Sequence, residues 1–320
     1  MSKLWVYGPS TALGSERIDV AELLEQYGPV RPDFMDKTGF HTLYATPDDV
    51  SAMDLAVESI EKIDDGWWRD AVDGLVHVSS TSVLTAPGNA HLLQARLDLK
   101  KETFVLDIND ACTGFVRALA VVDAIIAAGL ARTVLLVAAD TYTKLYDPSE
   151  LKVSPLFSDG ASVLIVSGAP LSNVPDGVVA HEWEIIASTF RSEGGHAADL
   201  CITPDALRES GHLTMNGGAV YTFVLRNIAE VVQDLTDQAG SLDDVSWYVH
   251  QGSRTVVTAV EKVLNAEQGS LFRSAGYGNV VQSSIPFQLA DASGDESTIG
   301  FLGFGVGLTI AGAVVRQRRI

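Results

Sequence analysis

Cysteine and positive charge are both scarce in this chain. Its 320 residues contain two cysteines, Cys112 and Cys201, which is too few for a disulfide framework or a four-cysteine zinc site. Lysine and arginine together number 22 against 41 aspartates and glutamates, so the formal charge is −19. That acidity speaks against a general affinity for nucleic acid or for anionic membranes.

Long apolar runs and several familiar catalytic motifs are also missing from the sequence. The N-terminus carries no run of signal-peptide length, and the most apolar stretch, Val116–Ala139, is interrupted by Arg117, Asp123 and Arg132. This stretch predicts a buried helix followed by a buried strand, and we expect a cytoplasmic protein. No GxSxG, HExxH or phosphate-loop pattern occurs.

The segments that are present alternate between strand-like and helix-like patterns. Strand-like segments are Leu4–Tyr7, Gly74–Val78, Phe104–Ile108, Thr133–Ala138, Ser162–Ser167, Trp247–Val249 and Gly307–Ala313. Helix-like segments are Val50–Ile63, Asn89–Leu97, Gly114–Gly129, Ala219–Ala239, Thr255–Leu264 and Ser284–Ala290. Their alternation predicts an α/β protein with a mostly parallel sheet and helices on its faces.

A faint internal parallel links the two halves of the chain. One strand runs into a loop holding Cys112 and then a helix, and a later strand runs into a loop holding His250 and then a helix. Near the end of each half a glycine turn feeds an apolar strand, at Phe157–Val166 and Phe304–Val315. We take a duplication as a hypothesis, because alternating units of strand and helix resemble one another in any case.

Cys112 is the most informative residue for chemistry. It lies between a strand and a long apolar helix, where the positive end of the helix dipole favours a thiolate and lowers the pKa of a thiol. A sharp turn at this place also presents a nucleophile at the carboxyl ends of the strands, where α/β sheets bind ligands. The alternative is a buried small apolar side chain, which is the commoner role of a single cysteine.

A nucleophilic cysteine needs partners, and the sequence offers three. His250 differs from the other six histidines because it ends a strand and begins a loop, although a loop histidine bound to backbone is the plainer interpretation. Asn279 lies in a tight turn beside Gly278, where an ordinary turn asparagine would also fit. The glycine-rich Gly300–Gly307 could supply backbone N–H donors to an oxyanion.

Six ordered motifs together resemble the β-ketoacyl-acyl carrier protein synthase III family, which has the thiolase fold. They cover the chain from about Gly74 to Arg316, and its N-terminus more loosely. The motifs are DINDACTGFVRAL around Cys112, LFSDGASVLIV, MNGGAVYTFVLRNI, VHQGSRT at His250, YGNVVQSSIPFQLAD at Asn279 and the closing FGVGLTIAGAVVR. VSSTS at Val78–Ser82 resembles the polar loop that precedes the nucleophile in that family.

The resemblance implies a five-layer αβαβα fold built from two similar halves, which we place at residues 1–170 and 171–320. It implies a catalytic set of Cys112, His250 and Asn279, with the backbone N–H groups of Cys112 and Val306 as the oxyanion hole. It also implies a homodimer, with Ser79–Pro87 near the partner subunit. No metal or bound cofactor is required, and acyl-coenzyme A or acyl carrier protein delivers the acyl groups.

The implied function is a condensing ketosynthase. An acyl group is loaded from a thioester onto Cys112, and decarboxylative condensation with a malonyl thioester then gives a 3-ketoacyl product. One alternative is an acyltransferase of the same family that passes the acyl group to a hydroxyl or amine of a natural product, without decarboxylation. Another is a non-catalytic partner subunit of a heteromeric ketosynthase. Intact Cys112, His250 and Asn279 favour condensation over both.

Several residues depart from the family pattern and resemble branches that serve specialised metabolism. Thr113 replaces a common alanine, Val280–Val281 replaces Thr-Ser, and Val306 stands where glycine is common. Phe34 and Lys37 occupy the segment where the family uses a tryptophan and an arginine to hold coenzyme A. Arg254 is expected either to contact an acidic carrier protein or to be a solvated charge. Leu84–His91 and Thr189–Ile202 are expected to form walls of the acyl pocket. Cys201 is expected to have no catalytic role.

Overall fold

A computed structural model describes residues 3–28, 31–63, 66–203, 213–266 and 270–320. The elements up to residue 170 are β1 (Lys3–Leu13), β2 (Glu16–Asp19), α1 (Val20–Tyr27), α2 (Phe34–Thr38), β3 (Thr42–Ala45), α3 (Ala52–Glu61), β4 (Gly74–Val78), α4 (Asn89–Arg96), β5 (Phe104–Ile108), α5 (Gly114–Ala127), β6 (Thr133–Asp140) and β7 (Gly160–Ser167). Those that follow are β8 (Ala180–Ser192), β9 (Leu200–Ile202), β10 (Leu213–Met215), α6 (Gly217–Ala239), β11 (Ser246–Val249), α7 (Arg254–Leu264), α8 (Ser284–Ala290), β12 (Thr298–Gly305) and β13 (Thr309–Arg319).

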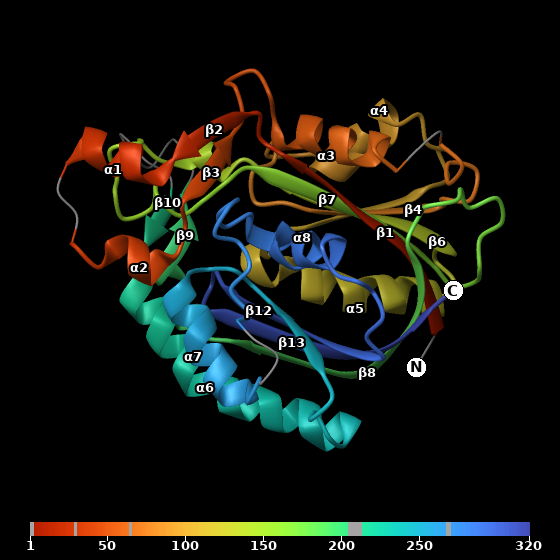
Figure 1. The fold of residues 1–320 in the computed structure, drawn as a ribbon. Coiled ribbons are helices and arrows are strands. Elements are labelled where there is room, and N and C mark those ends of the chain that lie inside the picture. Colours follow the sequence, from red (N-terminus) through yellow and green to blue (C-terminus); the bar gives the residue numbers. More distant parts are fainter. Residues whose placement is uncertain (1–2, 29–30, 64–65, 204–212, 267–269) are drawn as a thin grey trace.

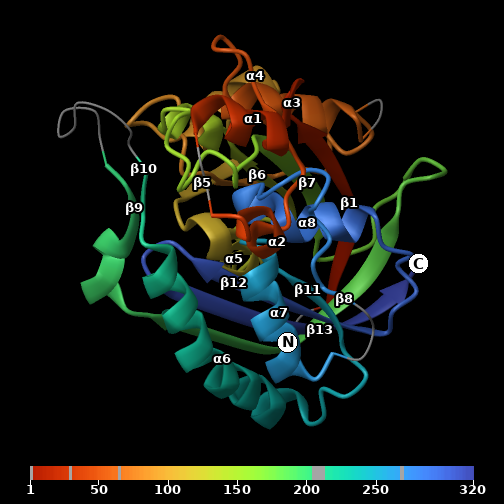
Figure 2. The same ribbon diagram turned by 60° about the vertical axis from the view of Figure 1, so that its left-hand side comes forward.

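Five layers of helix and sheet make up the molecule. The main sheet has the strand order β11-β12-β13-β8-β1-β7-β6-β4-β5, and it bends so that its two parts face each other across α5 and α8 (Figure 1). Helices α3 and α4 cover the outer face of one part, and α6 and α7 cover the other (Figure 2). The middle layer is the apolar core, in which Phe115 of α5 packs edge-on against Phe301 of β12. The expected five-layer αβαβα arrangement is confirmed.

The strand pairings of the first half recur in the second. Strands β4 and β6 are parallel, and so are β11 and β12. The next pairs, β6 with β7 and β12 with β13, are antiparallel. Strand β7 then pairs antiparallel with β1, and β13 pairs antiparallel with β8. Two halves of the same topology are therefore present, as expected. The boundary at residue 170 falls between β7 and β8 and stays a prediction.

The expectation of a mostly parallel sheet was wrong. Parallel pairing is confined to β4 with β5, β4 with β6 and β11 with β12, whereas the five other pairings of the main sheet are antiparallel. The long strands β1 and β8 cause the difference, because they pair antiparallel with each other and join the two parts into one sheet. The apolar pattern of the sequence predicts only part of β1, Leu4–Tyr7, and no strand at β8.

The apolar stretch Val116–Ala139 forms most of α5 and of the buried strand β6, as predicted. None of the helices within the described ranges is long and apolar enough to cross a membrane. Strands β4 and β5 and helix α8 have the predicted bounds, while β12 was not recognised because three glycines interrupt its pattern.

Candidate active site

The turn that carries Cys112 is short and tightly packed. It leaves β5 through a single 3-10 turn, Ala111–Thr113, and enters α5 at Gly114. Ala111 adopts the left-handed φ of 39°, which an alanine adopts only when its surroundings hold it there. A Cβ on Gly114 would lie 2.5 Å from Cγ1 of Val78, so glycine lets the start of α5 pack against β4. The thiol of Cys112 is thereby held at the wall of a cavity and is buried.

The closing hairpin between β12 and β13 approaches Cys112 from the second half. A Cβ on Gly305 would lie 2.9 Å from the Sγ of Cys112, and a Cβ on Gly303 would lie 2.8 Å from its carbonyl oxygen. Hydrogen bonds from the backbone N–H groups of Val306 and of Cys112 itself act to lower the pKa of the thiol. Two neutral donors thus converge on the sulfur from different segments of the chain.

Burial outweighs these hydrogen bonds and raises the pKa of Cys112 to about 12. The negative charges of Asp140 and Asp110 add to the rise. The expectation that the start of the helix would lower the pKa of this thiol was therefore wrong, because desolvation of the thiolate is the larger effect here. Cys112 is therefore a neutral thiol near pH 7.

His250 lies at the end of β11, where its backbone N–H donates to the carbonyl oxygen of Leu302 at 2.8 Å. Its ring packs edge-on against Phe304, with ring centres 5.3 Å apart. The ring nitrogen Nδ1 is buried and has no hydrogen-bond partner among the described residues. Burial lowers the pKa of His250 to about 4, against an opposing effect of the Val281 backbone. The imidazole is therefore neutral near pH 7.

Backbone and side-chain hydrogen bonds fix the orientation of Asn279. Its backbone N–H donates to the carbonyl oxygen of Leu156 at 2.9 Å, and its own carbonyl oxygen accepts from the N–H of Ser158 at 2.9 Å. The side-chain oxygen Oδ1 accepts from the N–H of Val281 at 2.9 Å. Because a backbone N–H can meet only an acceptor, the NH₂ of the amide is the free end of the side chain. Asn279 therefore offers a donor.

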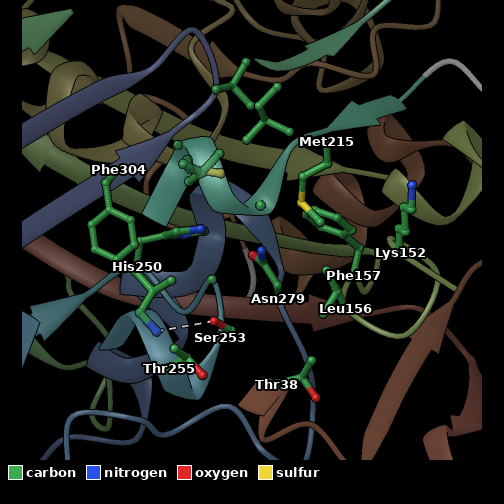
Figure 3. Close-up of a pocket in the computed structure, with 18 of the residues that line it drawn as sticks. Thr38, Lys152, Leu156, Phe157, Met215, His250, Ser253, Thr255, Asn279 and Phe304 are labelled. Atoms are coloured by element: carbon green, nitrogen blue, oxygen red, sulfur yellow. Dashed lines mark hydrogen bonds between the residues drawn. The ribbon is translucent and has the colours of Figure 1, made fainter. Parts of the chain in front are cut away.

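One cavity of about 260 Å³ brings Cys112, His250, Asn279 and Val306 together. Figure 3 shows His250 beside Phe304, with Asn279 between it and Phe157. A thiol, a neutral imidazole, an amide donor and two convergent backbone N–H groups suit acyl transfer through a covalent thioester, with oxyanions met by neutral donors. In the described parts of the chain, no cluster of three or more His, Cys, Asp or Glu side chains could hold a metal ion.

Comparison with known proteins agrees with this chemistry. Two family models, 3-oxoacyl-[acyl-carrier-protein (ACP)] synthase III and its C-terminal part, match residues 106–194 and 235–317, more than half of the chain. A β-ketoacyl-[acyl-carrier-protein] synthase III of Rhizobium johnstonii is 30% identical over 268 residues, covering 82% of this chain and 81% of that protein. The solved 3-oxoacyl-(acyl-carrier protein) synthase of Burkholderia xenovorans has a TM-score of 0.85 at 26% identity, covering 99% of this chain and 94% of that one. The chain belongs to the 3-oxoacyl-[acyl-carrier-protein] synthase III family.

A priming β-ketosynthase of the R1128 polyketide pathway is also similar in fold, with a TM-score of 0.81 at 20% identity, covering 97% of this chain and 95% of that one.

Of the residues predicted to bind substrate, two line the cavity of this synthase III family member. Phe34 and Lys37, both on α2, are at its wall, and Lys37 forms an ion pair of 2.7 Å with Asp33. Arg254 lies outside the lining, at the start of α7, with its guanidinium 5.3 Å from the ring centre of Phe272. Its Nη1 donates to the carbonyl oxygen of Asp36 at 3.5 Å, so it packs against α2 beside the cavity.

Lys152 is a lining residue that the sequence analysis missed. It is exposed and lies on the Phe157 side of the cavity (Figure 3). Nothing in the sequence marked it, because it lies in a loop between β6 and β7 that has no recognisable motif. With Lys37, it gives the cavity wall two ammonium groups.

The two expected wall segments contribute unequally. Leu200 is the only residue of Leu84–His91 and Thr189–Ile202 in the described lining of the Cys112 cavity. Leu84 and Cys201 instead line a neighbouring hollow of about 540 Å³, which shares Leu200 and Val306 with the cavity. Cys201 is partly exposed, and its Sγ is 3.9 Å from the carbonyl oxygen of Ala198.

Asp140 is a buried acid whose charge acts on the thiol of Cys112. Its Oδ1 accepts from Ser79, from the N–H of Ser80 and from both donors of Thr81, at 2.8 to 3.2 Å. Its Oδ2 has no partner at hydrogen-bond distance, and neither does the buried Oε1 of Gln282, whose NH₂ donates to backbone carbonyls. Burial, the largest influence, raises the pKa of Asp140 to about 6, although hydrogen bonds from Ser80, Thr81, Gln282 and Ser79 oppose this rise.

We expect Asp140→Asn to stabilise the protein above pH 6. A pKa raised in the folded state gives stability that is present below the unfolded value near 4 and lost as the pH rises through 6. Asparagine keeps the accepting oxygen, supplies a permanent N–H and carries no charge, so the free energy of unfolding should rise by about 2 kcal/mol at pH 8. Urea unfolding at pH 5 and pH 8 measures this, and the gain should be smaller at pH 5.

Asp159→Asn is the matched control for this substitution. Asp159 is also buried, but Thr46 and Thr143 donate to both of its carboxylate oxygens. An amide NH₂ there would face donors, so this variant should be less stable at pH 8. An Asp140→Asn variant that is also destabilised at pH 8 would contradict a raised pKa of Asp140 in the folded state.

Proposed function

We propose that this protein is a 3-ketoacyl synthase that loads an acyl group from a thioester onto Cys112 and condenses it with a malonyl thioester. The observation that carries this function is the convergence of Cys112, neutral His250 and the donor end of Asn279 in one cavity. The set contains a nucleophile for the acyl group and two neutral donors for an enolate. Membership of the synthase III family supports the same activity.

In the first step, the sulfur of Cys112 attacks the thioester carbonyl carbon. The oxyanion formed is met by the N–H groups of Cys112 and Val306, both of which hydrogen-bond to the sulfur before the reaction. The carbon–sulfur bond of the donor then breaks, and the proton of the Cys112 thiol leaves with the departing thiolate. His250, with its neutral ring, can carry that proton between the two sulfurs.

In the second step, the malonyl thioester loses carbon dioxide and its bonding electron pair becomes an enolate. His250 and Asn279 donate hydrogen bonds to the enolate oxygen. The enolate carbon attacks the acyl group on Cys112, and the same two backbone N–H groups meet the second oxyanion. As this oxyanion collapses, the carbon–sulfur bond to Cys112 breaks, the sulfur takes up a proton from water, and a 3-ketoacyl thioester is released.

Two alternatives use less of this site. An acyltransferase that hands the acyl group to a hydroxyl or amine forms no enolate, so it would leave the donor of Asn279 without a task. A non-catalytic partner subunit would need neither the thiol nor the two N–H groups that converge on it. The burial and orientation of all three side chains therefore favour condensation.

The donor is proposed to be acyl-coenzyme A, acyl carrier protein or both, and no cofactor is bound. Lys37 and Lys152 line the cavity and suit a phosphate-bearing donor, while Phe34 offers an aromatic face beside them. Lys37 is partly neutralised by Asp33, which weakens its pull on a phosphate. Arg254 is the proposed contact for an acidic carrier protein, which must approach a chain of charge −19.

A homodimer is proposed for the working enzyme. β5 is the edge strand of the main sheet, and its apolar residues are only half-buried. Val83 and Leu84, in the segment expected near a partner, expose 46% and 43% of their surface. A second copy would cover this edge, and a particle mass of one 34.1 kDa chain in sedimentation would contradict it.

A place in specialised metabolism is the finer proposal, supported by the departures at Phe34, Lys37, Thr113 and Val280–Val281. The cytoplasmic location stays a prediction from the sequence.

Mass spectrometry of the intact protein tests the proposed function. Incubation with acyl thioesters from acetyl to decanoyl, carried on coenzyme A and on acyl carrier protein, should give an adduct that Cys112→Ala lacks, and a malonyl thioester should then discharge it with release of carbon dioxide. An adduct without decarboxylation of any malonyl donor would instead support acyl transfer. Absence of any adduct would support the partner-subunit alternative.

A further inference from the structure

A line of buried hydroxyl groups joins the nucleophile turn to the closing hairpin. The Oγ1 of Thr113, the residue after the nucleophile, lies 3.0 Å from the Oγ1 of Thr309 on β13. The Oγ1 of Thr309 donates to the carbonyl oxygen of Val306 at 2.8 Å. On the other side, the Oγ1 of Thr113 donates to Oδ2 of Asp110 at 2.6 Å. Thr113 is fully buried and Thr309 nearly so.

This line connects the two residues whose N–H groups converge on the thiol. Thr113 is bonded covalently to Cys112, and Val306 is the residue that Thr309 anchors. The two segments are far apart in the sequence. Gly303 lets β12 approach the backbone of Cys112 and Thr113, and Gly305 leaves room for the side chain of Cys112. The Thr113–Thr309 contact is a side-chain link between the same two segments, so it can fix the spacing of the two donors.

We propose that Thr113 and Thr309 are positioning residues that set the geometry of the oxyanion hole formed by Cys112 and Val306. The proposal rests on the proposed function. Neither Thr113 nor Thr309 lines the cavity, so both act through the backbone segments that their hydroxyl groups hold. Oxyanion stabilisation depends steeply on donor placement, which makes such a link kinetically important.

Asp110 holds the other end of this line. Its Oδ2 accepts from the Oγ1 of Thr113 and forms an ion pair with the Nε of Arg117 at 3.0 Å. Its backbone carbonyl oxygen also accepts from the Oγ1 of Thr113, at 3.1 Å.

Single-turnover acylation of Cys112 tests the proposal. With the acyl-coenzyme A that acylates the wild type fastest, Thr113→Val and Thr309→Val should each lower the rate at saturating donor by about tenfold, less than removal of a whole donor. The donor concentration for half-maximal rate should stay within about twofold. The double variant should be no slower than the worse single one, because the two residues act as a unit. Thr113→Ser and Thr309→Ser, which keep the hydroxyls, should restore the rate.

Two controls distinguish a loss of donor positioning in the oxyanion hole from a general disturbance of the structure. Alkylation of Cys112 by iodoacetamide forms no oxyanion, so its rate in the valine variants should fall far less than the rate of acylation, through the weakened hydrogen bonds to the thiolate alone. Thr133→Val removes one hydroxyl of a similar buried pair, in which the Oγ1 of Thr133 lies 3.0 Å from the Oγ of Ser167. Neither residue lines the cavity, so this variant should be acylated at the rate of the wild type. If a valine variant fails to fold, Thr113→Ala, which only removes atoms, takes its place.

Equal acylation rates in wild type and variants would overturn this proposal and leave the proposed function intact. The same holds if alkylation and acylation fall together. No adduct on the wild-type protein would overturn the proposed function, and the role of the two threonines with it.

Discussion

Replacing Asn279 with alanine should lower the rate of malonyl decarboxylation by about 100-fold or more, while acylation of Cys112 changes by less than about threefold. The amide NH₂ is the end of Asn279 that its own loop leaves free, because Oδ1 accepts from the N–H of Val281. An enolate gains a hydrogen bond there that the malonyl ground state lacks, whereas the acyl oxyanion is met elsewhere. Carbon dioxide release and intact mass measure the two reactions separately.

The alanine variant also removes support from Val281, which adopts the left-handed φ of 51°. Asn279→Asp is the matched control, because a carboxylate keeps the acceptor for the Val281 N–H and loses the donor to the enolate. It should be as poor in decarboxylation as the alanine variant, with a folded loop. Equal losses of acylation and decarboxylation in both variants would refute the assigned role of Asn279.

The three proposed catalytic residues could be found from the sequence because each lies in a motif of local residues. Cys112 and His250 each follow a strand, and the alternation of strands with helices implies that such positions gather at one edge of a sheet. Asn279 lies in a loop between α7 and α8, so its motif alone pointed to it. The structure brings all three to one cavity. The bounds of β4 and β5 were likewise predictable, because both are short, apolar and β-branched or aromatic in composition.

Features that depend on contacts between distant segments could not be predicted. The glycines of β12 suggested a turn, yet Gly303 and Gly305 are strand residues that leave room for Cys112, and Gly300 leaves room for Trp247. Thr113 could be recognised as a departure from the family pattern, but its contact with Thr309 spans 196 residues. The pKa of Cys112 depends on how completely the second half buries it, which the local helix start does not reveal.

Alkylation of Cys112 by iodoacetamide should rise about tenfold per pH unit, roughly a thousandfold between pH 6.5 and 9.5, without a plateau. The thiolate is the reacting form, and burial raises the pKa of Cys112 to about 12, so its fraction grows with pH throughout this range. Cys201→Ser leaves Cys112 as the one thiol of the chain, and intact mass gives the rate at each pH.

The shape of this profile decides how the nucleophile is activated. A thiol of pKa about 12 beside an imidazole of pKa about 4 keeps its proton at rest, so no thiolate–imidazolium pair is stored in the free enzyme. The proton must then leave the sulfur while the carbon–sulfur bond forms. At that stage the negative charge develops on the carbonyl oxygen, where the N–H groups of Cys112 and Val306 stabilise it. A plateau with a midpoint below pH 8 would instead mean a preformed thiolate, and His250 would then serve the enolate alone.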